Sequence, residues 1–202
     1  MSRVAEASAE ARAALRASMR ARRAALRPET QREAAEALAE RLSRAFPGAE
    51  TIGVYAATQG ELSLEAFIRA SSQALRFAWP RTTGEGAMEL AVAEIDALTP
   101  GKYGILTAKN APVLAPRALD VMLIPGTAFS RDGGRLGMGG GYYDRYLAKV
   151  RPDCLRVGVG YQWQLVETLP LLPHDIRMTH LVSDKEYTPC TPPRSESERS
   201  LP

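Results

Sequence analysis

Four consecutive apolar residues, VMLI at positions 121–124, limit the folds open to this chain more than any other stretch of its 202 residues. They end at Pro125-Gly126, and such a run before turn residues is typical of a strand buried on both faces of a parallel sheet. On either side of this run, short strand patterns alternate with helical ones. This alternation favours an α/β fold with a largely parallel sheet.

The remaining elements are predicted from periodicity and turn residues. Apolar residues at positions 11, 15 and 19 share one face of a first helix, and a second helix begins at Pro28 and ends at Pro47-Gly48. Further strands are predicted at residues 51–55, 77–79, 88–93, 155–159 and 180–183, and further helices at residues 64–75 and 142–150. Residues 99–118 are expected to be mostly loop. Residues 1–188 are predicted to form one domain, whereas residues 189–202 lack apolar periodicity and are expected to be disordered.

Composition excludes several classes of protein. No apolar run approaches the roughly 20 residues of a membrane span, and the N-terminus lacks the apolar core of a signal peptide. The 26 basic and 23 acidic side chains give a net charge of +3, too small to indicate a nucleic-acid partner. We therefore expect a soluble, cytoplasmic protein without membrane or nucleic-acid partners. Cys154 and Cys190 fit neither a disulfide framework nor a zinc site, and we expect a buried Cys154 and a Cys190 in the loose tail.

A glycine-rich segment carries the chemistry. Residues 133–141, here called the glycine loop, hold six glycines in nine positions between the buried strand and a predicted helix. Glycines let successive backbone N–H groups converge on an anion, and the helix adds its positive N-terminal end. Arg135 can donate to phosphate oxygens, and Asp144 can hold Mg²⁺ while phosphates fill its other positions. The alternative is a flexible surface loop with Asp144 as a helix-start charge.

Two known phosphate-binding motifs do not describe the glycine loop. It is not a Walker loop, because no Gly-Lys-Ser/Thr follows it. Nor is it the dinucleotide fingerprint, which would belong to the first strand–helix unit and needs an acidic partner further along the chain. The segment must therefore be interpreted as a motif of its own.

The stretches IPGTAF at 124–129 and GRLGMGGGYYDR at 134–145 closely resemble the 5-formyltetrahydrofolate cyclo-ligase family, also called methenyltetrahydrofolate synthetases. The resemblance covers most of residues 8–187. It implies a three-layer α/β fold with helices on both faces of the sheet. It also implies ATP-dependent ring closure of 5-formyltetrahydrofolate to 5,10-methenyltetrahydrofolate, with release of ADP and phosphate. In that chemistry ATP phosphorylates the formyl oxygen and N10 attacks the activated carbon, so positioning and charge stabilisation suffice.

The resemblance assigns residues to the nucleotide. The family usually places a Lys four residues before an Arg; here Arg12 stands in the Lys position before Arg16, and both share one helix face. The alternative is a solvated face of an Arg-rich helix. Arg135, Tyr142 and Asp144 are the implied catalytic residues. The implied ATP-binding residues are Arg12, Arg16, Arg135, Leu136, Gly137, Met138, Gly139, Gly140, Gly141, Tyr142 and Tyr143.

The resemblance also assigns residues to the folate and to Mg²⁺. Glu61 matches the family's folate-binding acid, and its alternative role is a helix-start charge near Ser63. The other implied substrate contacts are Ala56, Met138 and Tyr142, and either Trp79 or Arg81 is expected to border the folate. The implied Mg²⁺ ligands are Asp144 and Asp175, the latter with a turn cap as its alternative and beside a structural His174.

The sequence departs from the family pattern at two places. Tyr103-Gly104-Ile105-Leu106 continues into Thr107-Ala108 where Glu-Pro is common, and Thr179 stands where an Asp is frequent. Both departures concern local packing or fine substrate contacts.

Two other functions compete with the cyclo-ligase. A sugar-phosphate isomerase or acyl-transfer relative needs a carboxylate or Lys beside the loop, and Lys149 lies too far along the helix. A non-enzymatic module would bind RNA through the basic N-terminal helix and keep a vestigial loop. The block from Arg135 to Asp144 keeps the whole family motif, which argues against a loop that has lost its function.

Overall fold

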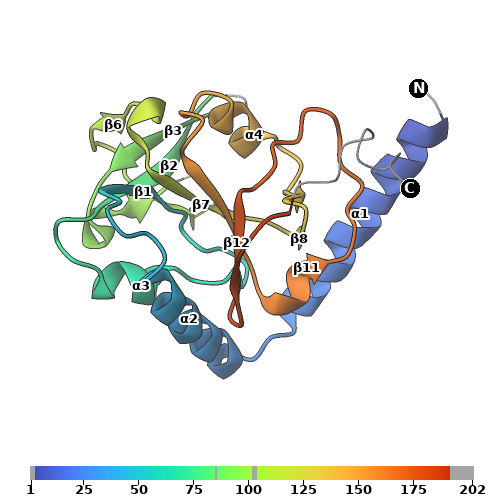
Figure 1. The fold of residues 1–202 in the computed structure, drawn as a ribbon, viewed down its shortest axis with the longest axis horizontal. Coiled ribbons are helices and arrows are strands. Elements are labelled where there is room, and N and C mark those ends of the chain that lie inside the picture. Colours follow the sequence, from blue (N-terminus) through green and yellow to red (C-terminus); the bar gives the residue numbers. More distant parts are fainter. Residues whose placement is uncertain (1–2, 85, 102–103, 192–202) are drawn as a thin grey trace, which may run out of the picture.

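An eight-stranded sheet forms the centre of the computed structural model, which describes residues 3–84, 86–101 and 104–191 (Figure 1). The strand order is β13-β12-β10-β7-β1-β2-β3-β6. The five strands from β12 to β2 pair in parallel, and β13, β3 and β6 join the sheet antiparallel. The strands are β1 (Thr51–Gly53), β2 (Arg76–Gly84), β3 (Ala87–Val92), β6 (Val113–Leu114), β7 (Val121–Pro125), β10 (Leu155–Val159), β12 (His180–Val182) and β13 (Tyr187–Pro189). The predicted α/β class with a largely parallel sheet is confirmed.

The strand β7 occupies the centre of this sheet, between β10 and β1. Residues 121–124 are at most 1% exposed, so the strand is buried on both faces as its apolar run predicts. Val121 and Leu123 belong to one apolar cluster, whereas Met122 and Ile124 belong to a second. The alternation follows from the two-residue period of a strand.

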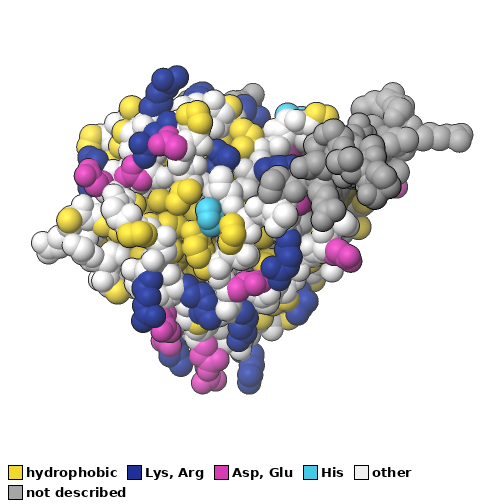
Figure 2. Space-filling model, viewed as in Figure 1, with side chains coloured by type: hydrophobic (Ala, Val, Ile, Leu, Met, Phe, Trp, Pro, Cys, Tyr) yellow, Lys and Arg dark blue, Asp and Glu magenta, His cyan; other side chains and the backbone are white. Residues whose placement is uncertain are grey.

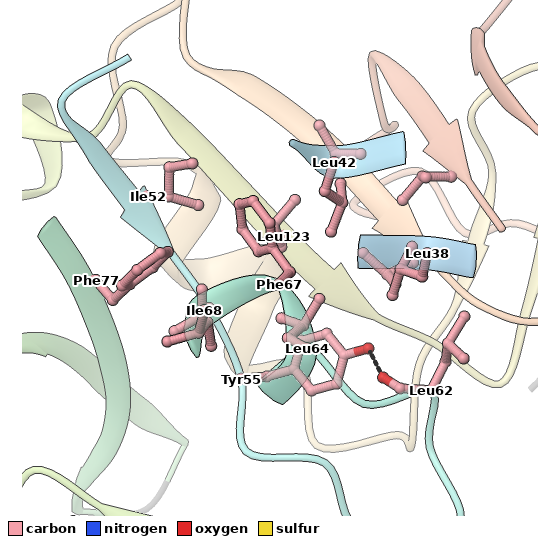
Figure 3. Close-up of a cluster of buried hydrophobic side chains, with 14 of the residues drawn as sticks. Leu38, Leu42, Ile52, Tyr55, Leu62, Leu64, Phe67, Ile68, Phe77 and Leu123 are labelled. Carbon is pink, nitrogen blue, oxygen red and sulfur yellow. Dashed lines mark hydrogen bonds between the residues drawn. The ribbon is translucent and has the colours of Figure 1, made fainter. Parts of the chain in front are cut away.

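Helices cover both faces of the sheet, as predicted. On one face α2 (Pro28–Leu42) and α3 (Glu65–Ala70) contribute Leu38, Leu42 and Phe67 to the cluster around Leu123 (Figure 3). On the other face α4 (Tyr142–Leu147) contributes Tyr146 to the second cluster. On the face shown in Figure 2, basic and acidic side chains alternate over α2, where Arg32 pairs with Glu36 in one i,i+4 pair.

Smaller elements surround the main sheet. The helix α1 (Arg3–Ala24) is long and contacts β8 of a small three-stranded sheet (Figure 1). That sheet has the order β11-β8-β9, and β4 pairs with β5 in a two-stranded one. Their bounds are β8 (Ala128–Ser130), β9 (Arg135–Leu136), β11 (Leu165–Val166), β4 (Thr99–Pro100) and β5 (Leu106–Thr107). Short 3-10 helices lie at Ile95–Ala97, Pro116–Ala118 and Gln162–Gln164. Among the described helices, none has the length and apolar character to cross a membrane.

Several predicted boundaries were wrong. The helix predicted at 64–75 ends at Ala70, because Ser71 is extended and its hydroxyl donates to the Phe67 carbonyl oxygen at 2.7 Å. The helix predicted at 142–150 ends at Leu147. Residues 99–118 contain β4, β5 and an edge strand, β6, which pairs with β3. These elements depend on pairing with distant residues, so local periodicity does not indicate them.

The predicted disordered tail begins too early. Pro189 belongs to β13, and the backbone N–H groups of Cys190 and Thr191 donate to the carbonyl oxygens of Thr179 and Arg131 at 2.8 and 3.0 Å. Residues 189–191 are therefore part of the fold, and Cys190 is half-buried rather than in a loose tail. Cys154 is buried, as predicted. Residues 192–202 lie outside the described residues.

Candidate active site

A cavity of about 1240 Å³ opens at the carboxyl ends of the central parallel strands. Tyr55 and Ala56, which follow β1, and Pro125 and Gly126, at the end of β7, form its floor. Crevices beyond the carboxyl ends of strands are the usual ligand sites of open α/β sheets. The position of the cavity therefore follows from the topology of the sheet.

One wall of the cavity is the β2–β3 hairpin. Of the residues of β2, only 76–78 pair with β1. The rest of β2 extends past the carboxyl end of β1 to Gly84. Pro80, Arg81 and Thr82 line the cavity from β2, and Met88 lines it from β3.

Arg81 ties this wall together. Its Nε donates to Glu89 Oε1 at 2.5 Å and its Nη1 to the Lys109 carbonyl oxygen at 2.9 Å. Of Trp79 and Arg81, one of which was expected to border the folate, Arg81 is the residue that lines the cavity. Trp79 is buried outside it, with Nε1 donating to the Ala93 carbonyl oxygen at 2.9 Å.

The glycine loop forms the opposite wall. All residues from Gly137 to Asp144 line the cavity. Gly139 and Gly141 have φ values of +105° and +65°, a backbone conformation that side chains strain. Leu136 is an exception among the predicted ATP-binding residues. Successive side chains of a strand point to opposite sides, so Leu136 points away from the cavity that its neighbour Arg135 lines. The Leu136 side chain is 1% exposed and belongs to the core.

Arg135 and Asp144 form an ion pair at the base of the glycine loop. Arg135 Nη2 donates to Asp144 Oδ2 at 2.9 Å, and Ile176 N–H donates to Asp144 Oδ1 at 3.2 Å. Arg135 is 6% exposed, and its guanidinium lies 5.4 Å from the Tyr143 ring centroid. Its Nε is buried and has no hydrogen-bond partner among the described residues. The ion pair therefore fixes Asp144, while the buried Nε–H group of Arg135 stays without an acceptor among the described residues.

The helix α1 brings two further arginines to the end of the cavity that contains Arg135 and Asp144. Arg12 Nη1 donates to Asp175 Oδ2 at 2.7 Å, and Arg16 Nε donates to the Gly137 carbonyl oxygen at 2.8 Å. Burial alone would raise the pKa of Asp175, but its bonds to Arg12 and to Leu172 N–H hold that pKa below its ordinary value. Burial and the nearby Arg12 lower the pKa of Arg16. The predicted basic pair thus faces the glycine loop, and three arginines against two aspartates give this end of the cavity an excess of positive charge.

Glu61 supplies a negative charge elsewhere in the cavity. Its Oε2 accepts from Thr58 N–H at 3.0 Å and from the Thr58 hydroxyl at 3.2 Å, and its Oε1 lies 3.7 Å from Arg23 Nη1. Burial raises the pKa of Glu61 against the opposing effects of Thr58 and Arg23. The alternative role as a helix-start charge is wrong, because α3 begins at Glu65 and the carboxylate bonds a turn instead.

Tyrosines enclose this acidic part of the cavity. Tyr55 donates its hydroxyl to the Leu62 carbonyl oxygen (Figure 3). Burial, followed by the charge of Glu61, raises the pKa of both Tyr55 and Tyr143. Two phenols beside one carboxylate make a polar recess that is shielded from water.

The structure adds lining residues that sequence reasoning missed. Thr107 and Lys109 line the cavity, as do the apolar side chains of Met88 and Ile105. Ile105 is 40% exposed, and Met138 on the opposite wall is 50% exposed. The departure from the family pattern at Thr107-Ala108 was the one signal in the sequence, because Thr107 lines the cavity.

The two predicted metal ligands, Asp144 and Asp175, both line the cavity. No cluster of three His, Cys, Asp or Glu side chains suited to a metal occurs in the part of the chain that the structure describes. Mg²⁺ usually takes one or two protein carboxylates together with substrate phosphates. The two carboxylates are oxygen ligands of the kind that Mg²⁺ takes, and in this structure each is paired with an arginine.

Parts of the chain are similar in sequence to known proteins. A mitochondrial 5-formyltetrahydrofolate cyclo-ligase from Arabidopsis thaliana is 36% identical over 93 residues, which cover 41% of this chain and 34% of that protein. The 5-formyltetrahydrofolate cyclo-ligase of Escherichia coli K12 is 43% identical over 76 residues, which cover 35% of this chain and 40% of that protein. The matched regions thus span less than half the length of these relatives.

Solved structures match over most of the chain. The structure of Aquifex aeolicus 5,10-methenyltetrahydrofolate synthetase has a TM-score of 0.81 and 29% identity, and the match covers 91% of this chain and 95% of that one. A Mycoplasma pneumoniae 5,10-methenyltetrahydrofolate synthetase, 23% identical, shares the fold with a TM-score of 0.71 over 86% of this chain and 99% of that one. The sequence profile of one family matches residues 8–184, which include the glycine loop and every polar group of the cavity described above. The chain belongs to the 5-formyltetrahydrofolate cyclo-ligase family.

Proposed function

We propose that the protein catalyses the ATP-dependent cyclisation of 5-formyltetrahydrofolate to 5,10-methenyltetrahydrofolate, with release of ADP and phosphate. The observation that carries this proposal is a single cavity of about 1240 Å³ with a cluster of arginines against a glycine loop and with a buried carboxylate. The volume exceeds the ~300–1,000 Å³ of a site for one small molecule, which agrees with two substrates that react together.

The phosphates bind between α1 and the glycine loop. Arg12 and Arg16 supply charged donors from one side, and Arg135 supplies them from the base of the loop. The N–H groups of residues 137–141 add neutral donors, as in other glycine-rich phosphate sites. Mg²⁺, arriving with the nucleotide, would be held by Asp144 and Asp175 and would supply positive charge against the phosphate oxygens.

The folate binds in the part of the cavity that contains Glu61. A carboxylate there can accept paired N–H groups from the pterin ring, and Ala56 borders the same recess. Met138, on the glycine loop, and Tyr142, the first residue of α4, form the side of the pocket that faces both substrates.

The reaction needs two steps and no nucleophilic side chain. The formyl oxygen attacks the γ-phosphorus, and the bond to ADP breaks. N10 then attacks the formyl carbon, the carbon–oxygen bond breaks, phosphate leaves with the formyl oxygen, and the N10 proton passes to solvent. Arg135, fixed by Asp144, stabilises charge on the transferring phosphoryl group, and Tyr142 packs beside the reacting groups.

An absorbance assay tests the proposed activity. Purified protein mixed with 5-formyltetrahydrofolate, ATP and Mg²⁺ is expected to generate the near-ultraviolet absorbance of the methenyl product. The same mixture without ATP is expected to stay unchanged. No product at any pH at which the protein is folded would overturn the proposal. The cytoplasmic location and the lack of nucleic-acid and membrane partners stay predictions from the sequence.

A further inference from the structure

A third arginine of α1 lies on the same helix face as the phosphate-binding pair. Arg12, Arg16 and Arg23 are separated by four and seven residues, which is the spacing of one face of a helix. The eleven residue steps from Arg12 to Arg23 span roughly 16 Å at 1.5 Å per step. The face therefore extends from the glycine loop, which Arg16 contacts, to Glu61, which Arg23 contacts.

Arg23 is buried beside Glu61 but outside the main cavity. Its side chain is 3% exposed, whereas the Glu61 carboxylate lines the cavity. Arg23 Nη1 lies 3.7 Å from Glu61 Oε1, and its Nε has no hydrogen-bond partner among the described residues. A buried guanidinium is costly unless a negative charge compensates it, and Glu61 is its one acidic partner among the described residues.

The other groups around Glu61 do not supply positive charge. Tyr55 and Tyr143 approach it from the end of β1 and from α4, and both are neutral phenols whose pKa the carboxylate raises further. Thr58 donates two neutral hydrogen bonds to Oε2. The hydroxyl of Tyr161 donates to the neighbouring Gly60 carbonyl oxygen at 3.1 Å rather than to the carboxylate. Arg23 is thus the cation that offsets the burial of Glu61.

We propose that Arg23 is a positioning residue, which acts through Glu61 by keeping this carboxylate ionised and fixed for the folate. The inference rests on the proposed folate-binding role of Glu61. Oε2 is occupied by Thr58, while Oε1 lies beyond hydrogen-bond distance from Arg23. Oε1 accepts no hydrogen bond from the described residues, so it can accept an N–H group of the substrate, and the charge of Arg23 favours the ionised form that does so.

Carbon-13 NMR titration of the Glu61 carboxyl group tests the coupling without any substrate. Its resonance is assigned by its loss in Glu61→Gln. We expect Arg23→Gln to move the titration midpoint to higher pH, because burial then acts with less opposition. We expect Arg23→Lys to give a smaller rise, since the charge is retained on a shorter side chain. Arg27→Gln, which removes an exposed arginine from the same region, is the matched control and is expected to leave the midpoint unchanged.

Kinetics then separate positioning from a purely structural role. Arg23→Gln is expected to raise KM for 5-formyltetrahydrofolate about tenfold, as for a buried charge that loses its partner, and KM for ATP hardly at all. The acidic limb of kcat/KM for the folate should move to higher pH together with the NMR midpoint. A structural role would instead lower the melting temperature and affect both substrates alike.

The outcomes distinguish this inference from the proposed function. An unchanged Glu61 midpoint in both Arg23 variants overturns the inference, even in an active enzyme. If Arg23→Gln does not fold, Arg23→Lys alone decides the question in the same way. A protein that never turns over the folate overturns the proposed function, whereas the NMR titration still reports whether Arg23 controls Glu61.

Discussion

Three arginines at one end of the cavity are held by acceptors of the fold. Arg12 binds Asp175, Arg135 binds Asp144, and Arg16 binds a carbonyl oxygen of the glycine loop. The guanidinium groups are thereby oriented before a phosphate arrives, which lowers the entropy lost on binding. The substitution of Arg12 for the family's usual Lys is accommodated, because Arg12 donates to both Asp175 and the Pro170 carbonyl oxygen.

Most of the predicted site residues could be identified from the sequence because they lie in short motifs. Arg12, Arg16, Glu61, Asp175 and the block 137–144 all line one cavity. Their roles in binding and catalysis stay predictions. Leu136 differs, since motif membership alone does not distinguish a backbone position in β9 from a side chain in the cavity.

Arg16→Ala is expected to weaken nucleotide use selectively. Loss of a charged donor to phosphate costs about 1.5–3 kcal/mol, so KM for ATP should rise roughly tenfold to a hundredfold. Folate affinity, measured by calorimetry, should change little, because Glu61 does not contact Arg16. Arg32→Ala, which removes an exposed arginine of α2, serves as the control. Equal ATP constants in Arg16→Ala and the parent would remove Arg16 from the phosphate site.

Among the elements, the glycine loop, α1 and the two strands of the hairpin wall have local sequence patterns, whereas the contacts that hold this wall in place do not. The periodicity of residues 11–19 and the run of glycines could be predicted from the sequence. The wall depends on Arg81, whose guanidinium bonds the carbonyl oxygens of Ala108, Lys109 and Ala111, 27 to 30 residues away. Such contacts have no local pattern. Strands were predicted at residues 77–79 and 88–93, whereas the attachment of residues 108–111 to Arg81 was not, because it falls in the stretch that was expected to be mostly loop.

Gly141→Ala tests whether the conformation of the glycine loop matters for the nucleotide. Gly141 has a φ of +65°, so an alanine there should lower the free energy of unfolding by about 1 kcal/mol. It should also raise KM for ATP, because the N–H groups of the loop would turn away from the phosphates. Gly48→Ala is the matched control: Gly48 has a φ of +79° with open space around it, and it does not line the cavity. Identical kinetics in the two variants would show that the loop conformation serves stability alone.

Considered together, the elements place a positive region and a carboxylate in one cavity at the carboxyl ends of the central parallel strands. The α/β class, the parallel order and the two helical layers follow from the buried run at residues 121–124 and from alternation. The end of the folded chain could not be predicted, because residues 189–191 are held by backbone bonds to Thr179 and Arg131 rather than by apolar periodicity. The proposed function requires that the two substrates bind in this cavity together and react directly with each other.

A direct reaction has a specific consequence, since the formyl oxygen must leave as part of the released phosphate. The decisive measurement uses 5-formyltetrahydrofolate labelled with oxygen-18 in the formyl group, together with unlabelled ATP, Mg²⁺ and the full chain. Mass spectrometry of the phosphate is expected to find one labelled oxygen in each molecule, formed in step with the methenyl absorbance. Unlabelled phosphate, with the label released into water, would contradict the account.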